Sequence, residues 1–285
     1  LIWLGVALLA AGLTWRIFKF ETKDAPANAK PVRVQVLEKP RARPVQRKTT
    51  QADRLTAFRQ LLATTHAEFA YVFRSPAFIV LLVIGLLNSL ASLFLLNEWY
   101  GSSTYPVTRV MVQALAGSFT LFPLIIAVYY GGELVWRDRE RRTHEIVDST
   151  SAPDWVHVLP KILATSLALG VTILVAVATG IFSQAVRGYF NFELTRYLLW
   201  FALPAFLMVC QWAVLSVFVQ VLAPQKYVGW AVMLVFIVLN VALSSAGFEH
   251  NLYGFSGVPQ MPMSDMAGVD RFWIGVFWFN VYWSA

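Results

Sequence analysis

Residues 162–186 read ILATSLALGVTILVAVATGIFSQAV, a run of apolar and small polar side chains without a single charge. At 1.5 Å of rise per residue, a helix of this length can cross the roughly 30 Å of hydrocarbon in a lipid bilayer. Four more uncharged runs of at least 20 residues cover Ala77–Leu96, Val110–Gly132, Tyr197–Ala223 and Tyr227–Phe248. The sequence therefore predicts an all-α fold, a polytopic membrane helix bundle.

Shorter apolar runs stand at both ends of the sequence. One starts near Phe272 and continues to Ala285, and as a helix it would extend only about 21 Å, so we expect a truncated sixth span. The other, Leu1–Trp15, has its positive charges after it rather than before it. This order is wrong for a signal peptide, and we interpret residues 1–15 as the end of a preceding membrane span.

The overall composition also favours a membrane protein. The chain is 58% hydrophobic and 14% charged, whereas a soluble domain has about a quarter charged residues. The net charge of +7 alone is compatible with nucleic-acid binding, but the long uncharged runs favour membrane lipid as the partner instead. The single cysteine, Cys210, excludes an intrachain disulfide framework and a cysteine-based zinc site.

Two kinds of segment precede the first long run. Residues 16–54 are rich in proline, lysine and arginine, and this composition buries too little apolar surface to fold alone, which predicts a basic cytoplasmic linker. Residues 55–74 instead have apolar side chains at steps of three and four, which predicts an amphipathic helix lying in the headgroup plane. We expect it to end at Ser75, because Pro76 disfavours helical geometry there. The predicted apolar stripe consists of Leu55, Phe58, Leu62, Phe69 and Val72, with Thr65 among them.

Lysine and arginine are distributed unequally between the two sides of these spans. Segments 16–74 and 133–161, together with Lys226, contain 19 of the 23 basic residues. The loops on the other side contain the remaining four. Because cytoplasmic loops carry the excess of lysine and arginine, we predict that segments 16–74 and 133–161 are cytoplasmic.

Motifs for catalysis are missing from the sequence. Neither a G-x-x-x-x-G-K-[ST] phosphate-binding loop nor an H-E-x-x-H zinc motif occurs, and His144–Asp148 has aspartate where the second histidine would stand. We therefore expect no enzyme activity, no catalytic residue and no cofactor or metal site in this chain. The five complete spans contain no Asp, Glu, Lys or Arg, which weighs against a proton-coupled transporter.

Polar residues and prolines do occur inside the spans. We expect the polar side chains to join helices through hydrogen bonds, and Pro123 and Pro204 to kink their helices. The polar residues are Asn88, Ser89, Ser92, Gln113, Gln184, Gln211 and Asn240.

The densest pattern of opposite charges follows the second run, from Glu133 onward. Several of these charges stand at i, i+4, Glu133 and Arg137 among them, where opposite charges support a helix. We expect a second short helix over Trp155–Leu159, before Lys161. A solvated loop and a docking surface for a cytoplasmic partner are the alternatives, and the density of opposed charges favours docking. The residues predicted to dock are Glu133, Arg137, Glu140, Arg141, Glu145, Asp148 and Trp155.

This segment resembles the permease subunits of type-2 ABC exporters, whose second span continues into a Glu- and Arg-rich stretch that ends near a proline turn. The matching positions here are Glu140, Arg141, Glu145, Ser149, Ala152 and Pro153. The order of elements over 55–285 matches too, since an interfacial helix precedes the first span and a long outer segment separates the last two. In that family the outer segment, here 249–271, often dips back into the membrane.

A closer likeness is to bacterial proteins in which two six-span halves are followed by a zinc aminopeptidase domain. Residues 132–137 (GELVWR), 144–148 (HEIVD) and 263–266 (MSDM) look like the second half there. Residues 1–15 would then end a span of the first half, and 16–54 would link the halves.

The resemblance implies a six-span permease of an ATP-driven exporter in the bacterial inner membrane. Its implied partners are a cytoplasmic ABC ATPase, which binds the ATP and docks on segment 133–161, and a second permease half or a homodimer partner. A membrane anchor for a fused or associated peptidase, without transport, is the alternative. A secondary transporter or channel is a third possibility, weakened by the absence of charge within the spans.

Overall fold

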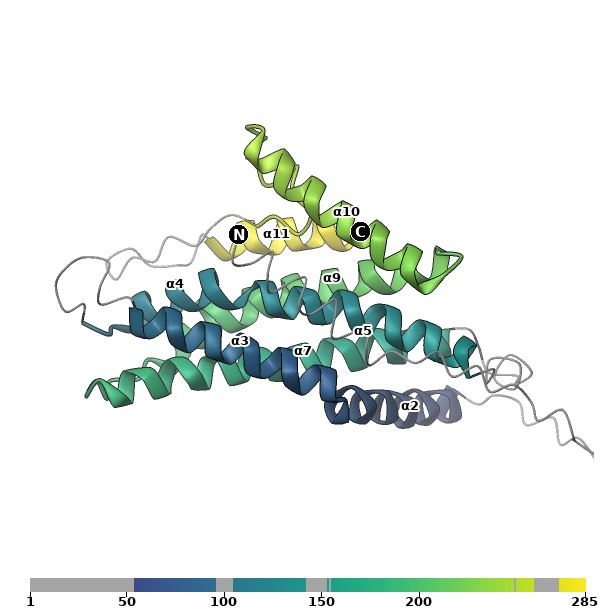
Figure 1. Ribbon diagram of the computed structural model, residues 1–285, viewed down its shortest axis with the longest axis horizontal. Helices are drawn as coiled ribbons and strands as arrows, with labels where there is room; N and C mark the ends of the chain where they lie inside the picture. Colours follow the sequence, from purple (N-terminus) through teal and green to yellow (C-terminus); the bar gives the residue numbers. More distant parts are fainter. Residues whose placement is uncertain (1–53, 96–104, 142–152, 154, 249, 259–271) are drawn as a thin grey trace, which may run out of the picture. The chain divides into compact units, whose positions relative to one another are not determined.

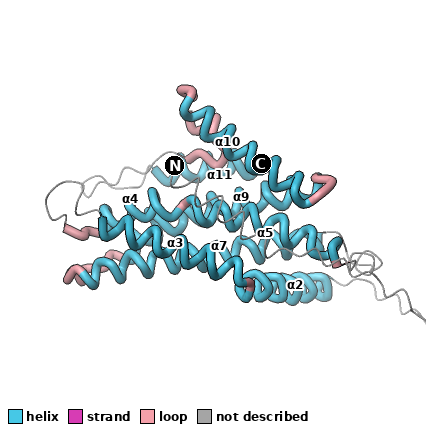
Figure 2. The backbone as a smooth tube through the Cα atoms, in the orientation of Figure 1, coloured by secondary structure: helices cyan, strands magenta, loops and turns pink. Residues whose placement is uncertain are grey.

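The computed structural model of the protein describes residues 54–95, 105–141, 153, 155–248, 250–258 and 272–285 (Figure 1). Within these ranges all regular structure is helical and no strand occurs (Figure 2). Five helical stretches are long and apolar enough to cross a membrane, which confirms the predicted all-α, multi-pass class. They are Pro76–Leu95, Thr108–Glu140, Trp155–Val186, Leu194–Leu222 and Lys226–Leu243. The predicted preceding span 1–15 and nearly all of the linker 16–54 lie outside the described residues.

The helices follow the predicted runs closely. Their bounds are α2 (Arg54–Arg74), α3 (Pro76–Leu95), α4 (Thr108–Phe119), α5 (Leu121–Glu140), α7 (Trp155–Val186), α8 (Leu194–Arg196), the π-helix η1 (Tyr197–Ala202), α9 (Leu203–Leu222), α10 (Lys226–Ser245) and α11 (Phe272–Ser284).

Helix α7 lies at the centre of the packing and α10 at its edge. Helices α3, α5 and α9 all pack against α7 and lie side by side with it in Figure 1. In the most apolar 18-residue stretch of each helix, 50% of the residues of α7 are buried, but only 11% of the residues of α10 are. Large side chains such as Tyr130, Leu169 and Tyr197 fill the space between these helices. The outward surfaces of the helices remain apolar, as lipid contact requires.

Both predicted kinks coincide with interruptions of helical hydrogen bonding. Pro123 has no N–H to donate to Phe119, and the long second span divides at Thr120 into α4 and α5. Pro204 likewise has no N–H for Trp200, and the π-helix η1 precedes it directly. In each case, the lost bond explains why the helix changes its pattern there.

The predicted short helix Trp155–Leu159 is wrong as a separate element. Residues 155–186 form one continuous helix of 32 residues, with Pro160 inside it. Pro160 removes only the bond to Val156, and both of these residues are buried. Their packing offsets the loss of one hydrogen bond, so the helix continues through the proline.

Helix α2 confirms the predicted helix but divides its apolar stripe. Leu55, Phe58 and Leu62 are more than half exposed, with exposed fractions of 65%, 54% and 54%. Phe69 is half-buried. A neighbouring face packs against α7, and its residues are Ala57, Leu61, Thr65, Glu68 and Val72. The placement of α2 in the headgroup plane stays a prediction.

Several of the predicted polar side chains inside the spans join helices, whereas the hydroxyl of Ser89 is buried without a hydrogen-bond partner among the described residues. Asn88 donates to the carbonyl of Ser118 (2.9 Å), and Gln184 donates to that of Pro106 (2.8 Å) and accepts from Tyr197. Gln211 pairs with Asn280 of α11 in the same way. These bonds pair amide groups that would be costly to leave unpaired in lipid, although the amide oxygen of Gln211 is buried without a partner among the described residues.

The described part of the outer segment, residues 250–258, folds back onto the helices. The ring of Phe255 packs against Trp212, Phe236 and Trp283, with ring centroids 5.1–5.7 Å apart. Its backbone N–H donates to Asn240 Oδ1 of α10 (3.0 Å). This part therefore packs onto α9, α10 and α11, while its position relative to the membrane stays a prediction.

Candidate functional site

Charged side chains from four helices meet where α5 ends. We name this group the charged cluster. It contains Glu68 and Tyr71 of α2, Glu133, Arg137, Asp138 and Glu140 of α5, Lys161 of α7 and Lys226 of α10.

A buried ion pair of the charged cluster joins α5 to α2. Arg137 Nη2 lies 2.5 Å from Glu68 Oε1, and the two side chains are 14% and 6% exposed. The guanidinium also lies 4.6 Å from the centre of the Tyr71 ring. The second carboxylate oxygen of Glu68 is buried without a hydrogen-bond partner in the described structure. Glu68 therefore depends on the charge of Arg137 for its burial.

Lys161 joins α7 to α5. Its ammonium donates to Asp138 Oδ2 (2.5 Å) and to the carbonyl oxygen of Leu134 (2.6 Å). It also lies 3.9 Å from Glu68, so α2, α5 and α7 share one electrostatic centre.

Lys226 joins α10 to α5 at the other side of the charged cluster. Its ammonium lies 2.6 Å from Glu133 Oε2 and 3.2 Å from Glu140 Oε1. Glu133 accepts a further hydrogen bond from the Tyr71 hydroxyl (3.1 Å), so one carboxylate links α10 to α2. The pKa of Tyr71 is raised, chiefly by burial and then by Glu133. Since a raised pKa favours the protonated hydroxyl, this donor is kept at neutral pH and is lost only as the pH rises through the raised value.

Two glycines let the helices approach closely beside the charged cluster. A Cβ placed on Gly132 of α5 would overlap Trp230 Nε1 of α10, and one on Gly229 of α10 would overlap the Gln220 amide of α9. The same amide accepts a hydrogen bond from Trp136 Nε1 (3.0 Å). At each of these contacts, the backbone of one helix therefore lies directly against a side chain of the next helix.

The structure redistributes the predicted charge pairs. Glu133 and Arg137 were expected to pair along one helix, but Glu133 pairs with Lys226 and Arg137 with Glu68. Each residue pairs with a partner on another helix rather than with its i, i+4 neighbour. A charge pair that is buried between helices is stronger than a pair on the exposed surface of one helix.

The predicted docking residues fall into three groups. Glu133 and Arg137 lie inside the bundle, while Glu140, Arg141 and Trp155 are exposed and accessible to a partner. Glu145 and Asp148 lie outside the described residues.

Five residues of the charged cluster were missed as site residues, namely Glu68, Tyr71, Asp138, Lys161 and Lys226. Glu68 shares a helix face with Leu61, Thr65 and Val72, and the spacing of these residues would have revealed the buried acid. Lys161 and Lys226 each stand at the edge of an uncharged run, which gives no indication of a partner.

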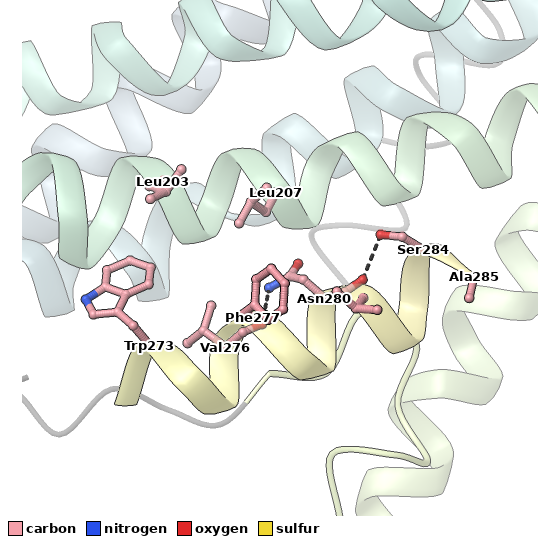
Figure 3. Close-up of a pocket in the computed structure, with 9 residues that line it drawn as sticks. Leu203, Leu207, Trp273, Val276, Phe277, Asn280, Ser284 and Ala285 are labelled. Carbon is pink, nitrogen blue, oxygen red and sulfur yellow. Dashed lines mark hydrogen bonds between the residues drawn. The ribbon is translucent and has the colours of Figure 1, made fainter. Parts of the chain in front are cut away.

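An open apolar groove of about 620 Å³ lies between α9 and α11 (Figure 3). Leu203 and Leu207 line one wall, and residues of α11 line the other. Two polar side chains line the groove, the amide of Asn280 and the hydroxyl of Ser284. Both donate hydrogen bonds to backbone carbonyls of α11 itself. The groove offers apolar contact with little specific polar recognition.

Comparison with known proteins gives no match, either to a family model, to a curated protein or to a solved structure. The resemblance to exporter permeases therefore stays a prediction from the sequence. Among the described residues, no group of three or more His, Cys, Asp or Glu side chains is arranged to hold a metal ion.

Proposed function

We propose that this chain is the transmembrane permease of an ATP-driven exporter of the type-2 ABC kind, coupled to a separate ATPase through segment 133–161. The observation that supports this most is the charged cluster. It links both ends of that segment, the last turns of α5 and Lys161 of α7, to α2 and α10.

In this proposal a force applied to the segment reaches four helices at once. Removing one partner of a buried ion pair costs about 3–5 kcal/mol, so Arg137 and Glu68 stay together when α5 moves. α2 then follows α5, and Lys226 carries α10 with them. ATP binding by the partner would shift the population between two arrangements of the spans.

The proposal assigns different roles to the predicted docking residues. Glu140, Arg141 and Trp155 are exposed and would contact the ATPase. Glu133 and Arg137 are buried in the charged cluster and would transmit the movement. A passive peptidase anchor has no need for such links between a cytoplasmic segment and four helices, which favours the exporter over the alternative.

Co-purification with the ATPase subunit tests the dock. We expect the full-length protein to retain the ATPase and the triple variant Glu140→Ala, Arg141→Ala and Glu145→Ala to lose it.

A matched control is Glu98→Ala, Glu193→Ala and Arg196→Ala, which likewise removes two acidic residues and one basic residue, here from the predicted outer side. This control should retain the ATPase. Unchanged binding by the first variant, or equal loss in both, would contradict docking on segment 133–161.

A further inference from the structure

The basic residues near the charged cluster differ in whether a carboxylate neutralises them. Arg137, Lys161 and Lys226 each pair with at least one Asp or Glu. Arg74 and Arg141 form no ion pair within the described ranges, although the Arg141 guanidinium lies 5.9 Å from the centre of the Tyr71 ring. Among the described residues, these two positive charges near Tyr71 therefore have no carboxylate partner.

Arg74 stands at the boundary of the membrane. It is the last residue of α2, and the candidate span α3 begins two residues later at Pro76. The start of a span lies at the level of the lipid phosphates, where arginine side chains are favoured. The exposed Arg74 side chain is therefore at the depth of a headgroup.

An open pocket of about 580 Å³ lies at this junction. Ala67 and Ala70 leave room in it because their side chains are small, while Arg74 and Ser75 supply hydrogen-bond donors. A planar guanidinium can donate two parallel hydrogen bonds to a phosphate. The chemistry of the pocket thus suits a phosphate with a negative charge.

An apolar surface continues from the pocket along α3. Pro76 lines the pocket, and Ile79, Val80 and Val83 follow it at helical spacing on the same face. Their exposed fractions are 50%, 55% and 46%. A soluble phosphate would leave this surface uncovered, whereas acyl chains would cover it.

We propose that the pocket between α2 and α3 binds an anionic phospholipid, with its phosphate on Arg74 and its acyl chains along Ile79, Val80 and Val83. The lipid would occupy the side of Tyr71 that faces the pocket, while the Tyr71 hydroxyl keeps its bond to Glu133. This binding site is independent of whether the chain works as an exporter.

Lipid titration of the purified full chain in detergent tests the proposal. The melting temperature is measured against dioctanoyl phosphatidylglycerol, dioctanoyl phosphatidylcholine and glycerol 3-phosphate. We expect the anionic lipid to stabilise the protein at lower concentration than the zwitterionic one, and glycerol 3-phosphate to have no effect. Arg74→Gln should weaken the apparent affinity for phosphatidylglycerol about fivefold, the effect of one basic residue at a membrane surface.

Arg59→Gln is the matched control, because Arg59 is exposed on the same helix and lies outside the pocket. It should leave the affinity within about twofold. Ala67→Trp fills the pocket without changing charge and should weaken binding as Arg74→Gln does. Equal affinity in the native protein and Arg74→Gln, or equal loss in Arg59→Gln, overturns the site. Stabilisation by glycerol 3-phosphate that also depends on Arg74 overturns the lipid as its ligand.

Discussion

Glu68 is an acid on the buried face of a helix, and its environment makes it sensitive to substitution. Its carboxylate contacts Arg137 at 2.5 Å and Lys161 at 3.9 Å, and it is 5% exposed. Two positive charges thus share one buried negative charge. A change at this residue affects the balance of charge for α2, α5 and α7 together.

Replacing Glu68 by alanine should lower the free energy of unfolding by about 3 kcal/mol, since it leaves the buried Arg137 with only the more distant carboxylate of Asp138 at 3.5 Å. Thermal unfolding in detergent measures the effect. Glu193→Ala is the control, because the side chains of the Glu193–Arg196 pair are about a third exposed, and the variant should cost less than about 1 kcal/mol. Equal losses in the two variants would show that the charged cluster adds nothing beyond a surface pair.

Gly132 and Gly117 differ in how much space surrounds their Cα atoms. Gly132→Ala should destabilise the protein, because the added methyl group overlaps the indole of Trp230. Gly117→Ala should leave it unchanged or raise its stability by up to about 1 kcal/mol, since no atom lies within 4 Å of the added carbon and alanine favours the helix. Melting temperatures distinguish the two, and a stabilised Gly132→Ala would contradict the close contact of α5 with α10.

At the scale of elements, the sequence predicts the spans well and their contacts poorly. Uncharged runs such as 77–96 and 162–186 correspond to α3 and α7 because crossing hydrocarbon demands both length and apolar side chains. The pairing of Arg137 with Glu68 depends on which helices are neighbours, and a single sequence contains no record of that. Local spacing offered Glu133 as a nearer partner, which explains the wrong pair.

Helix α2 has one face against α7 and another that is apolar and exposed, and its relation to lipid can be measured. In a Cys210→Ala background, a spin label at Leu62 should be accessible to oxygen dissolved in lipid. A label at Gln60, which lies almost opposite on the same helix, should instead be accessible to a water-soluble nickel chelate. Similar accessibility at both positions would contradict the interfacial placement of α2.

The whole molecule makes a prediction about orientation. The excess of lysine and arginine predicts that the charged cluster lies on the cytoplasmic side and the loop after α7 outside. A membrane-impermeant maleimide added to intact cells should label Phe190→Cys, where the native side chain is 71% exposed. It should not label Arg139→Cys until the membrane is permeabilised, and the reverse pattern would invert the topology.

Pro123 has a consequence for how the second span responds to force. The residue between α4 and α5, Thr120, keeps helical backbone angles (φ −59°, ψ −32°), so the two helices follow each other without a loop. The hydrogen bond that would stiffen this point is missing, because proline has no N–H. We therefore expect the span to bend more easily between α4 and α5 than elsewhere along its length. In the proposed exporter, torque applied at Glu140 would turn α5, while α4, which Asn88 holds at Ser118, would stay in place.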